Sequence, residues 1–173
     1  MSLARLWAHR WLTVILALIL TACATRLPPP TTPDALFWSG RMALNIASTP
    51  AQSISAGFEL KSQQQNGELQ LFSPLGSTLA KLQWTPGKAS LEQGGELWQD
   101  SSLDTLLIRL TGTALPIAAL VDWLQARPTQ VEGWRADLSQ ISSGKLRVIS
   151  LPASTTTSTG ALPQVTLLLI VEP

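Results

Sequence analysis

Residue types that often carry chemistry are scarce in this chain of 173 residues, which has one cysteine, Cys23, one histidine, His9, and no tyrosine. A single cysteine cannot form a disulfide within the chain. A thiol or imidazole mechanism would depend on Cys23 or His9; His9 lies in an N-terminal region typical of a signal peptide, and Cys23 directly follows that region. The sequence also has no phosphate-binding loop, no metal-ligand spacing and no Ser-His pairing. We therefore expect a protein that is not an enzyme and that uses no cofactor or metal.

Charged residues are few and balanced. Lys and Arg together number 12 against 11 Asp and Glu, which gives a net charge of +1 at pH 7, and no stretch of the sequence concentrates basic residues. Binding to nucleic acid, or to anionic lipid by charge, needs concentrated positive charge. We expect no nucleic-acid partner, and membrane attachment has to come from another feature.

The N-terminal segment supplies such a feature. Basic residues precede an apolar run at 11–20, which is too short to span a bilayer, and small residues stand before Cys23. This pattern matches the bacterial lipobox, in which the cysteine is diacylated, the signal is cut, and the new amine is acylated. We expect residues 1–22 to be a lipoprotein signal peptide and Cys23 to be the lipid anchor. The alternatives are an ordinary secretory signal with a chance cysteine, and an anchor helix, which Arg26 and the prolines after it disfavour.

A proline-rich stretch follows the cysteine. Four prolines lie among threonines between residues 26 and 33, a composition that favours an extended tether. We expect residues 23–36 to be the lipidated cysteine and its tether, and residues 37–173 to form one domain. A leader with no geometric role is the alternative.

Short segments with β-strand character fill most of the expected domain. Ile54, Phe58 and Leu60 recur at period two, and turn pairs such as Asn66-Gly67 and Pro86-Gly87 separate neighbouring segments. The pattern predicts an antiparallel meander with strands at 37–46, 53–61, 68–72, 78–84, 88–92, 96–99, 134–141, 145–151 and 165–171.

Two segments have helical periodicity instead. Ser101 or Ser102 can cap a helix whose leucines recur from Leu103 to Leu110 and which Gly112 closes, and Pro116 opens a second helix that runs to Leu124. Each helix has one wide aliphatic face, which has to lie on the sheet to avoid a large exposed apolar patch. The predicted fold class is mainly β: a curved antiparallel sheet that forms an unclosed half-barrel, with a lid of two to three helices over a hydrophobic cavity.

Two polar patterns have weaker functional interpretations. Ser142 and Lys145 fit a Ser-x-x-Lys motif, but Gly144 between two predicted strands favours a hairpin turn over a nucleophile. Acidic residues recur every four positions from Glu92 to Asp104, and the Gly94-Gly95 pair between them rules out a continuous helix, which favours a solvated rim.

Aliphatic and tryptophan side chains are more abundant than any polar motif. Tryptophans are more often core than ligand site, yet a curved sheet under two aliphatic helices offers a concavity lined by carbon that suits acyl chains. We expect that cavity to draw on Ile54, Phe58, Leu60, Leu82, Trp84, Leu103, Leu106, Leu107, Leu110, Leu120 and Leu124.

Three stretches together resemble a known family. They are Phe37-Trp38 with Gly40-Arg41, the segment LQLFSPLGSTLAKLQWTPGKASL at 69–91, and LLIRLTGTALPIAALVDWLQARP at 106–128. They are similar to the LolB family of outer-membrane lipoprotein receptors. The chain departs from the family pattern at Ala126, where glycine is common, and at its C-terminal end, where one apolar strand stands in place of two.

The resemblance implies a function. It implies an acyl-binding cavity and a protein on the periplasmic side of the outer membrane of a Gram-negative bacterium. Such a protein receives lipoproteins from the periplasmic carrier LolA and inserts them into outer-membrane phospholipid. We also expect a monomer. A structural outer-membrane lipoprotein, acting as an assembly or cell-wall scaffold, is the alternative.

One residue has an unusual position in the predicted hairpin at 73–77. Leu75 stands between Pro74 and Gly76 at the tip, where turns favour polar residues. The resemblance implies that Leu75 protrudes and touches the membrane. The alternative is that Leu75 folds back onto its own hairpin.

Overall fold

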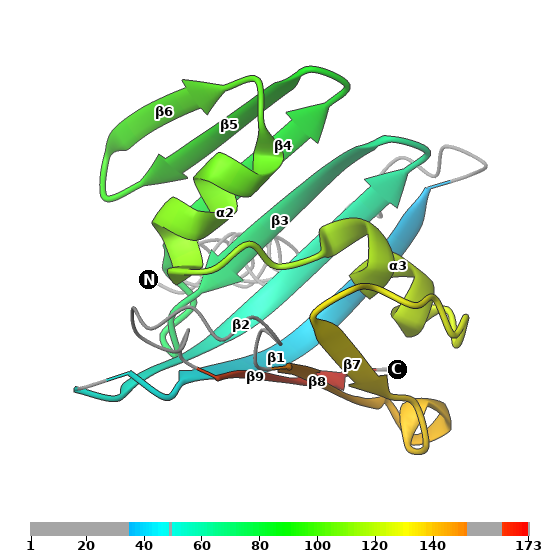
Figure 1. Ribbon diagram of the computed structural model, residues 1–173. Helices are drawn as coiled ribbons and strands as arrows, with labels where there is room; N and C mark the ends of the chain where they lie inside the picture. The colour runs from blue at the N-terminus through cyan, green and yellow to red at the C-terminus, as the bar shows by residue number, and fades with distance from the viewer. Residues whose placement is uncertain (1–34, 49, 152–163, 173) are drawn as a thin grey trace, which may run out of the picture. The chain divides into compact units, whose positions relative to one another are not determined.

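The computed structural model describes residues 35–48, 50–151 and 164–172, all within one compact unit, residues 34–173 (Figure 1). Cys23, the predicted signal peptide and nearly all of the predicted tether lie outside the described residues. Among the helices that these residues form, none combines the length and the apolar character needed to cross a membrane.

One antiparallel sheet contains all nine strands of the described chain. Along the sheet the order is β6-β5-β4-β3-β2-β1-β9-β8-β7, with β6 and β7 at its two edges, so the sheet does not close. This confirms the predicted fold class. The strands are β1 Leu36–Ile46, β2 Gln52–Gln63, β3 Asn66–Phe72, β4 Thr78–Thr85, β5 Lys88–Gln93, β6 Glu96–Asp100, β7 Trp134–Asp137, β8 Lys145–Ser150 and β9 Val165–Val171.

Two α-helices interrupt the meander between β6 and β7. Helix α2, Leu103–Thr111, begins at the N-cap Ser102, whose hydroxyl accepts a hydrogen bond from the N–H of Thr105, and ends at Gly112 with φ +75°. Helix α3, Ile117–Leu124, follows the N-cap Pro116. Both helices lie on the same side of the sheet (Figure 1), which we call the inner face.

Alternation along the strands places the core on that inner face. In β2, buried residues from Ala56 to Ser62 alternate with more exposed neighbours, and β1 and β9 show the same pattern. A single apolar cluster joins the buried residues of seven strands and both helices. The largest fully buried side chains are Trp123, Leu44, Leu60, Leu82, Leu91, Leu107, Leu146 and Val148.

The structure differs from the predicted boundaries in two places. Strand β1 begins at Leu36, which was predicted to belong to the tether. Strand β7 ends at Asp137, although the sequence predicted a strand to residue 141, because Asp137 Oδ1 accepts the Ser139 N–H at 3.0 Å and turns the backbone. A 3-10 turn, Ile141–Ser143, then leads through Gly144 into β8.

Candidate functional site

All eleven residues predicted to line a cavity meet in the apolar cluster on the inner face. Seven of them are buried, and the other four, Ile54, Trp84, Leu103 and Leu110, are partly buried against that cluster. The sheet contributes Leu82 and α2 contributes Leu107, each with 0% of its surface exposed. The structure therefore brings the predicted residues together as a packed interior between the sheet and the helices.

The two helices have separate places over the sheet. Helix α2 packs on β4, β5 and β6. Its last turn carries Arg109, whose Cζ lies 4.9 Å from the centre of the Trp98 ring on the edge strand β6. Helix α3 adds Leu120, Trp123 and Leu124 to the shared cluster.

Trp84 has its position fixed by a glycine on the neighbouring strand. Gly67 is the register partner of Trp84, and a Cβ at residue 67 would overlap the Trp84 indole ring. The ring therefore lies directly on the Gly67 backbone, which only a residue without a side chain permits.

Sequence reasoning missed most of the buried interior. It did not include Trp123, although this residue is three positions after Leu120 on the same helical face and is 2% exposed. It also missed the inner-face residues of β1, β8 and β9, although they alternate at period two as the predicted ones do. These residues are Met42, Leu44, Ile46, Leu146, Val148, Val165, Leu167 and Leu169.

A pocket of about 440 Å³ opens between the segment after α3 and β7. Tryptophans form two of its walls: Trp123, whose Nε1 donates a hydrogen bond to the Thr129 carbonyl at 2.8 Å, and Trp134 on β7. The remaining lining residues are Pro128, Thr129, Gln130, Val131, Arg135, Ala136 and Leu138. Its volume lies in the range of small-molecule pockets, and it adjoins the interior at Trp123.

Leu75 lies at the tip of the β3–β4 hairpin with 95% of its surface exposed. The turn closes through the N–H of Ser73, which donates to the Ser77 carbonyl at 2.8 Å, and the N–H of Gly76, which donates to the Ser73 carbonyl at 2.9 Å. Gly76 has φ +84°, which an L-residue rarely adopts. Leu75 therefore points away from its own hairpin, and the alternative that it folds back is wrong.

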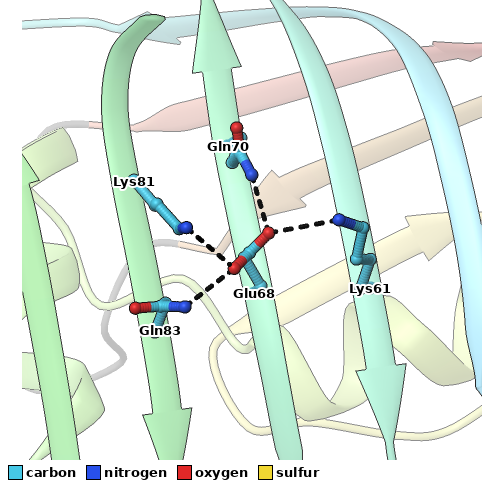
Figure 2. A network of polar contacts seen from close by, with 5 residues as sticks. All are labelled: Lys61, Glu68, Gln70, Lys81 and Gln83. Carbon is cyan, nitrogen blue, oxygen red and sulfur yellow. Dashed lines mark hydrogen bonds and ion pairs between the residues drawn. The ribbon is translucent and has the colours of Figure 1, made fainter. Parts of the chain in front are cut away.

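The opposite side of the sheet, which we call the outer face, carries a polar network centred on Glu68 of β3 (Figure 2). Glu68 Oε1 accepts from Gln70 Nε2 at 2.6 Å, and Oε2 accepts from Gln83 Nε2 at 2.8 Å. Nζ of Lys61 and Nζ of Lys81 lie 3.3 and 3.2 Å from the two oxygens. These contacts join β2, β3 and β4 across the face that the helices leave uncovered.

The network changes the acidity of Glu68. Burial alone would raise the pKa of this carboxyl group, but the hydrogen bonds from Gln70, Lys81, Gln83 and Lys61 outweigh burial and lower the pKa from 4.5 to about 2. Glu68 is thus ionised at neutral pH and acts as a structural anion rather than as a proton donor.

The polar motifs noted in the sequence do not assemble a reactive centre. Ser142 is exposed in the 3-10 turn, and the hydroxyl of Ser143 donates to the Gln140 carbonyl at 2.9 Å. Glu92, Glu96 and Asp104 are exposed on three different elements. Among the residues that the structure describes, no group of three or more His, Cys, Asp or Glu is arranged to hold a metal ion. The inner face is lined instead by the apolar cluster.

Comparison with known proteins gives the family. A family model described as "Outer membrane lipoprotein LolB" matches residues 37–154. The outer-membrane lipoprotein LolB of Bordetella petrii is 31% identical over 159 residues, covering 78% of this chain and 80% of that protein. Those of Cupriavidus taiwanensis and Chromobacterium violaceum are each 32% identical, over 140 and 127 residues, and the matches cover 77% and 69% of this chain and 68% and 69% of those proteins. The chain therefore belongs to the LolB family of outer-membrane lipoproteins.

Proposed function

We propose that this protein accepts lipoproteins from the periplasmic carrier LolA, holds their acyl chains between the inner face and the two helices, and releases them into the outer membrane. Family membership supports the proposal, and so does the packed apolar interior beneath two short helices. The observation that carries it is the meeting of Leu82 of the sheet with Leu107 and Leu124 of the helices in one cluster.

The free energy of acyl chains in water sets the requirements of the step. A triacylated lipoprotein carries three chains of roughly sixteen carbons, and at about 0.8 kcal/mol per CH₂ their exposure to water would cost tens of kcal/mol. Transfer must then run from one apolar site directly to another. The sequence has no nucleotide-binding loop, so we propose that affinity increases from the carrier to this protein and then to the bilayer.

Acceptance requires a rearrangement of the helices. Leu107 and Leu82 have no exposed surface, so an acyl chain can reach them only if α2 or α3 moves away from the sheet. The helices have nine and eight residues, and the pocket beside Trp123 gives an opening next to α3. We propose that acyl chains enter there and that their apolar surface replaces the contacts that the helices give up.

The anchor and the hairpin complete the proposal. We propose that residues 1–22 are removed, that Cys23 carries lipid, and that residues 24–35 connect it to the domain, which begins at Leu36. Leu75 would then touch the bilayer. Burying one leucine contributes about 1.5 to 3 kcal/mol, which is too little to hold a protein but enough to orient one that is already tethered.

A two-step transfer assay tests the proposed function. Lipoprotein bound to the carrier is mixed first with the purified full-length protein and then with outer-membrane vesicles. The double variant Leu107→Asp/Leu124→Asp should lose acceptance, whereas Ile108→Asp/Ala118→Asp, at exposed positions of the same helices, should retain it.

Because the buried charges also lower stability, a second measurement uses the unmodified protein. An environment-sensitive acyl probe should bind it and be displaced by lipoprotein. Absence of probe binding by a folded protein would favour the structural scaffold over the acceptor.

A further inference from the structure

Basic and aliphatic side chains alternate on the outer face of β8, β9 and β1. Five exposed residues lie on this face, each next in sequence to a buried inner-face residue. They are Arg41 of β1, Lys145 and Arg147 of β8, and Leu168 and Ile170 of β9. Register places Ile170 between Lys145 and Arg41, and it places Leu168 beside Arg147. We call these five residues the basic outer patch.

The aliphatic members of the basic outer patch are exposed to an unusual degree for the middle of a sheet. Leu168 is 37% exposed and Ile170 is 44% exposed. A shallow pocket of about 200 Å³ lies against Leu168 and is lined by Lys145, Arg147, Gln140 and Asp137. The patch thus offers apolar surface and a recess with two cations side by side.

Among the described residues, two other lysines of the outer face have a carboxylate partner, which the cations of the patch do not have within ion-pair distance. Lys61 and Lys81 are paired with Glu68. In the described chain, none of the three patch cations lies within 4 Å of a carboxylate oxygen. Hydrogen bonds with Ser139 lower the pKa of Asp137, and the positive charge of its register partner Arg147 lowers that pKa further. Asp137 thus offsets part of the charge of Arg147, whereas Arg41 and Lys145 leave positive charge available for an external anion.

We propose that the basic outer patch binds the anionic headgroups of a phospholipid bilayer, with Leu168 and Ile170 entering the interface between headgroups and acyl chains. Anionic lipid surfaces attract Lys and Arg side chains, each contributing roughly fivefold to partitioning, and exposed aliphatic side chains between the cations add apolar insertion. Charge complementarity favours this occupant, because the patch offers cations and aliphatic groups in alternation.

Strand register connects the patch to the hairpin that carries Leu75. Ile170, Arg41, Gly57 and Phe72 are successive partners across β9, β1, β2 and β3, and Phe72 is the last residue of β3 before that hairpin. At about 4.8 Å between strands, Ile170 lies roughly 14 Å along the sheet from the base of the hairpin. A bilayer in contact with the patch thus also lies near Leu75, and this inference gives the orientation in which the proposed function places its membrane contact.

A fluorescence experiment on the full-length protein in vesicles tests the proposal. A dye is attached to Ser55→Cys, which is exposed on the outer face in the row of Leu168 and Arg147, and a matched dye to Gln99→Cys on the edge strand β6. Vesicles contain a nitroxide-labelled lipid in phosphatidylcholine, with or without phosphatidylglycerol. We expect quenching of the dye at residue 55 only with phosphatidylglycerol, its loss as salt concentration rises, and little quenching at residue 99.

Charge reversal supplies the matched control. The quenched fraction gives an equilibrium constant for contact between the outer face and the bilayer. Arg147→Glu should lower this constant roughly fivefold or more. Lys88→Glu, at an exposed position outside the patch, should leave the constant unchanged. The salt titration of the protein with an intact patch decides the matter if Arg147→Glu does not fold.

Equal quenching at the two dye positions would overturn the proposal, and so would quenching that does not change with lipid charge and salt concentration. Lipoprotein transfer is measured in the same vesicles. Normal transfer without any dependence of quenching on lipid charge overturns this inference alone. Charge-dependent quenching without transfer supports this inference and overturns the proposed function.

Discussion

The guanidinium group of Arg109 lies over the indole ring of Trp98, with Cζ 4.9 Å from the ring centre. The contact joins the last turn of α2 to the edge strand β6, while the apolar side of α2 packs on β4 and β5. The proposed function requires α2 or α3 to move away from the sheet. If α2 moves, this exposed contact has to break.

Removing that contact should make α2 easier to open. Arg109→Met keeps most of the side chain's apolar length but removes the cation, and an exposed cation–π contact contributes about 0.5 to 1 kcal/mol. We expect hydrogen exchange of the α2 amides to become faster by a factor of roughly 2 to 5. Lys88→Met, at an exposed site on β5, is the control, and unchanged exchange in α2 would show that Arg109 does not restrain the helix.

Leu75 should matter for release rather than for folding. The side chain is 95% exposed, so Leu75→Glu should change the free energy of unfolding by less than about 0.5 kcal/mol. Insertion of lipoprotein into vesicles should fall by roughly tenfold to a hundredfold, while acceptance from the carrier stays normal. Leu97→Glu, 62% exposed on β6, should leave both steps unchanged. Normal insertion by Leu75→Glu would remove the assigned role.

Glu68 should make the free energy of unfolding depend on pH in the acid range. Its pKa is lowered from 4.5 to about 2 in the folded state, so the stabilisation is complete above pH 4.5 and is lost as the pH falls toward 2. The lowered pKa corresponds to at most about 3 kcal/mol, and solvent screening of the two lysines, 42% and 34% exposed, reduces the expected value to about 1 to 2 kcal/mol.

The test replaces Glu68 by its neutral isostere. Glu68→Gln should lower the free energy of unfolding at pH 7 by about 1 to 2 kcal/mol, and the difference from the unmodified protein should shrink toward zero at the acid end of that range. Glu92→Gln, at an exposed position, should have little effect. A loss of stability that is the same at pH 7 and at pH 2 would show that the charge of Glu68 is not its cause.

Ala126 occupies a position that favours glycine. Its φ is +59°, and the N–H groups of Ala126 and Arg127 donate to the carbonyls of Trp123 and Asp122, which is a Schellman motif. Ala126→Gly should raise the free energy of unfolding by about 0.5 to 1 kcal/mol, because relief of the left-handed strain outweighs the added freedom of the unfolded chain. Ala118→Gly, at an exposed site within α3, should lower it by a similar amount. Thermal unfolding of both variants measures these changes. A loss of stability in Ala126→Gly would contradict this account.

The sequence predicted elements whose signals are local. The alternation of Ile54, Phe58 and Leu60 predicted which side chains of β2 face the interior. Ser102 and Gly112 predicted the two ends of α2. Both signals are local, because side-chain direction and capping depend on near neighbours in the chain. The family pattern has glycine where this chain has Ala126. That preference also has a local cause, because the φ of Ala126 is positive.

Features that depend on strand register could not be predicted in the same way. Arg41 and Lys145 are over a hundred positions apart in the sequence, yet both flank Ile170 in the sheet. A chain that is nearly neutral as a whole therefore concentrates basic residues on one part of its outer face, which composition did not reveal. Local propensity also failed to end β7 at Asp137, where a single side-chain hydrogen bond turns the backbone.

Mapping where the acyl chains lie tests the central claim most directly. Lipoprotein whose acyl chains carry a diazirine is transferred from the carrier to the unmodified protein and photolysed, and the modified peptides are identified by mass spectrometry. The account predicts labels on inner-face residues, with Leu107 and Leu82 modified and the adjacent Ile108, which is 51% exposed, unmodified. Labels confined to Ile108 and the outer face, with transfer still proceeding, would contradict it.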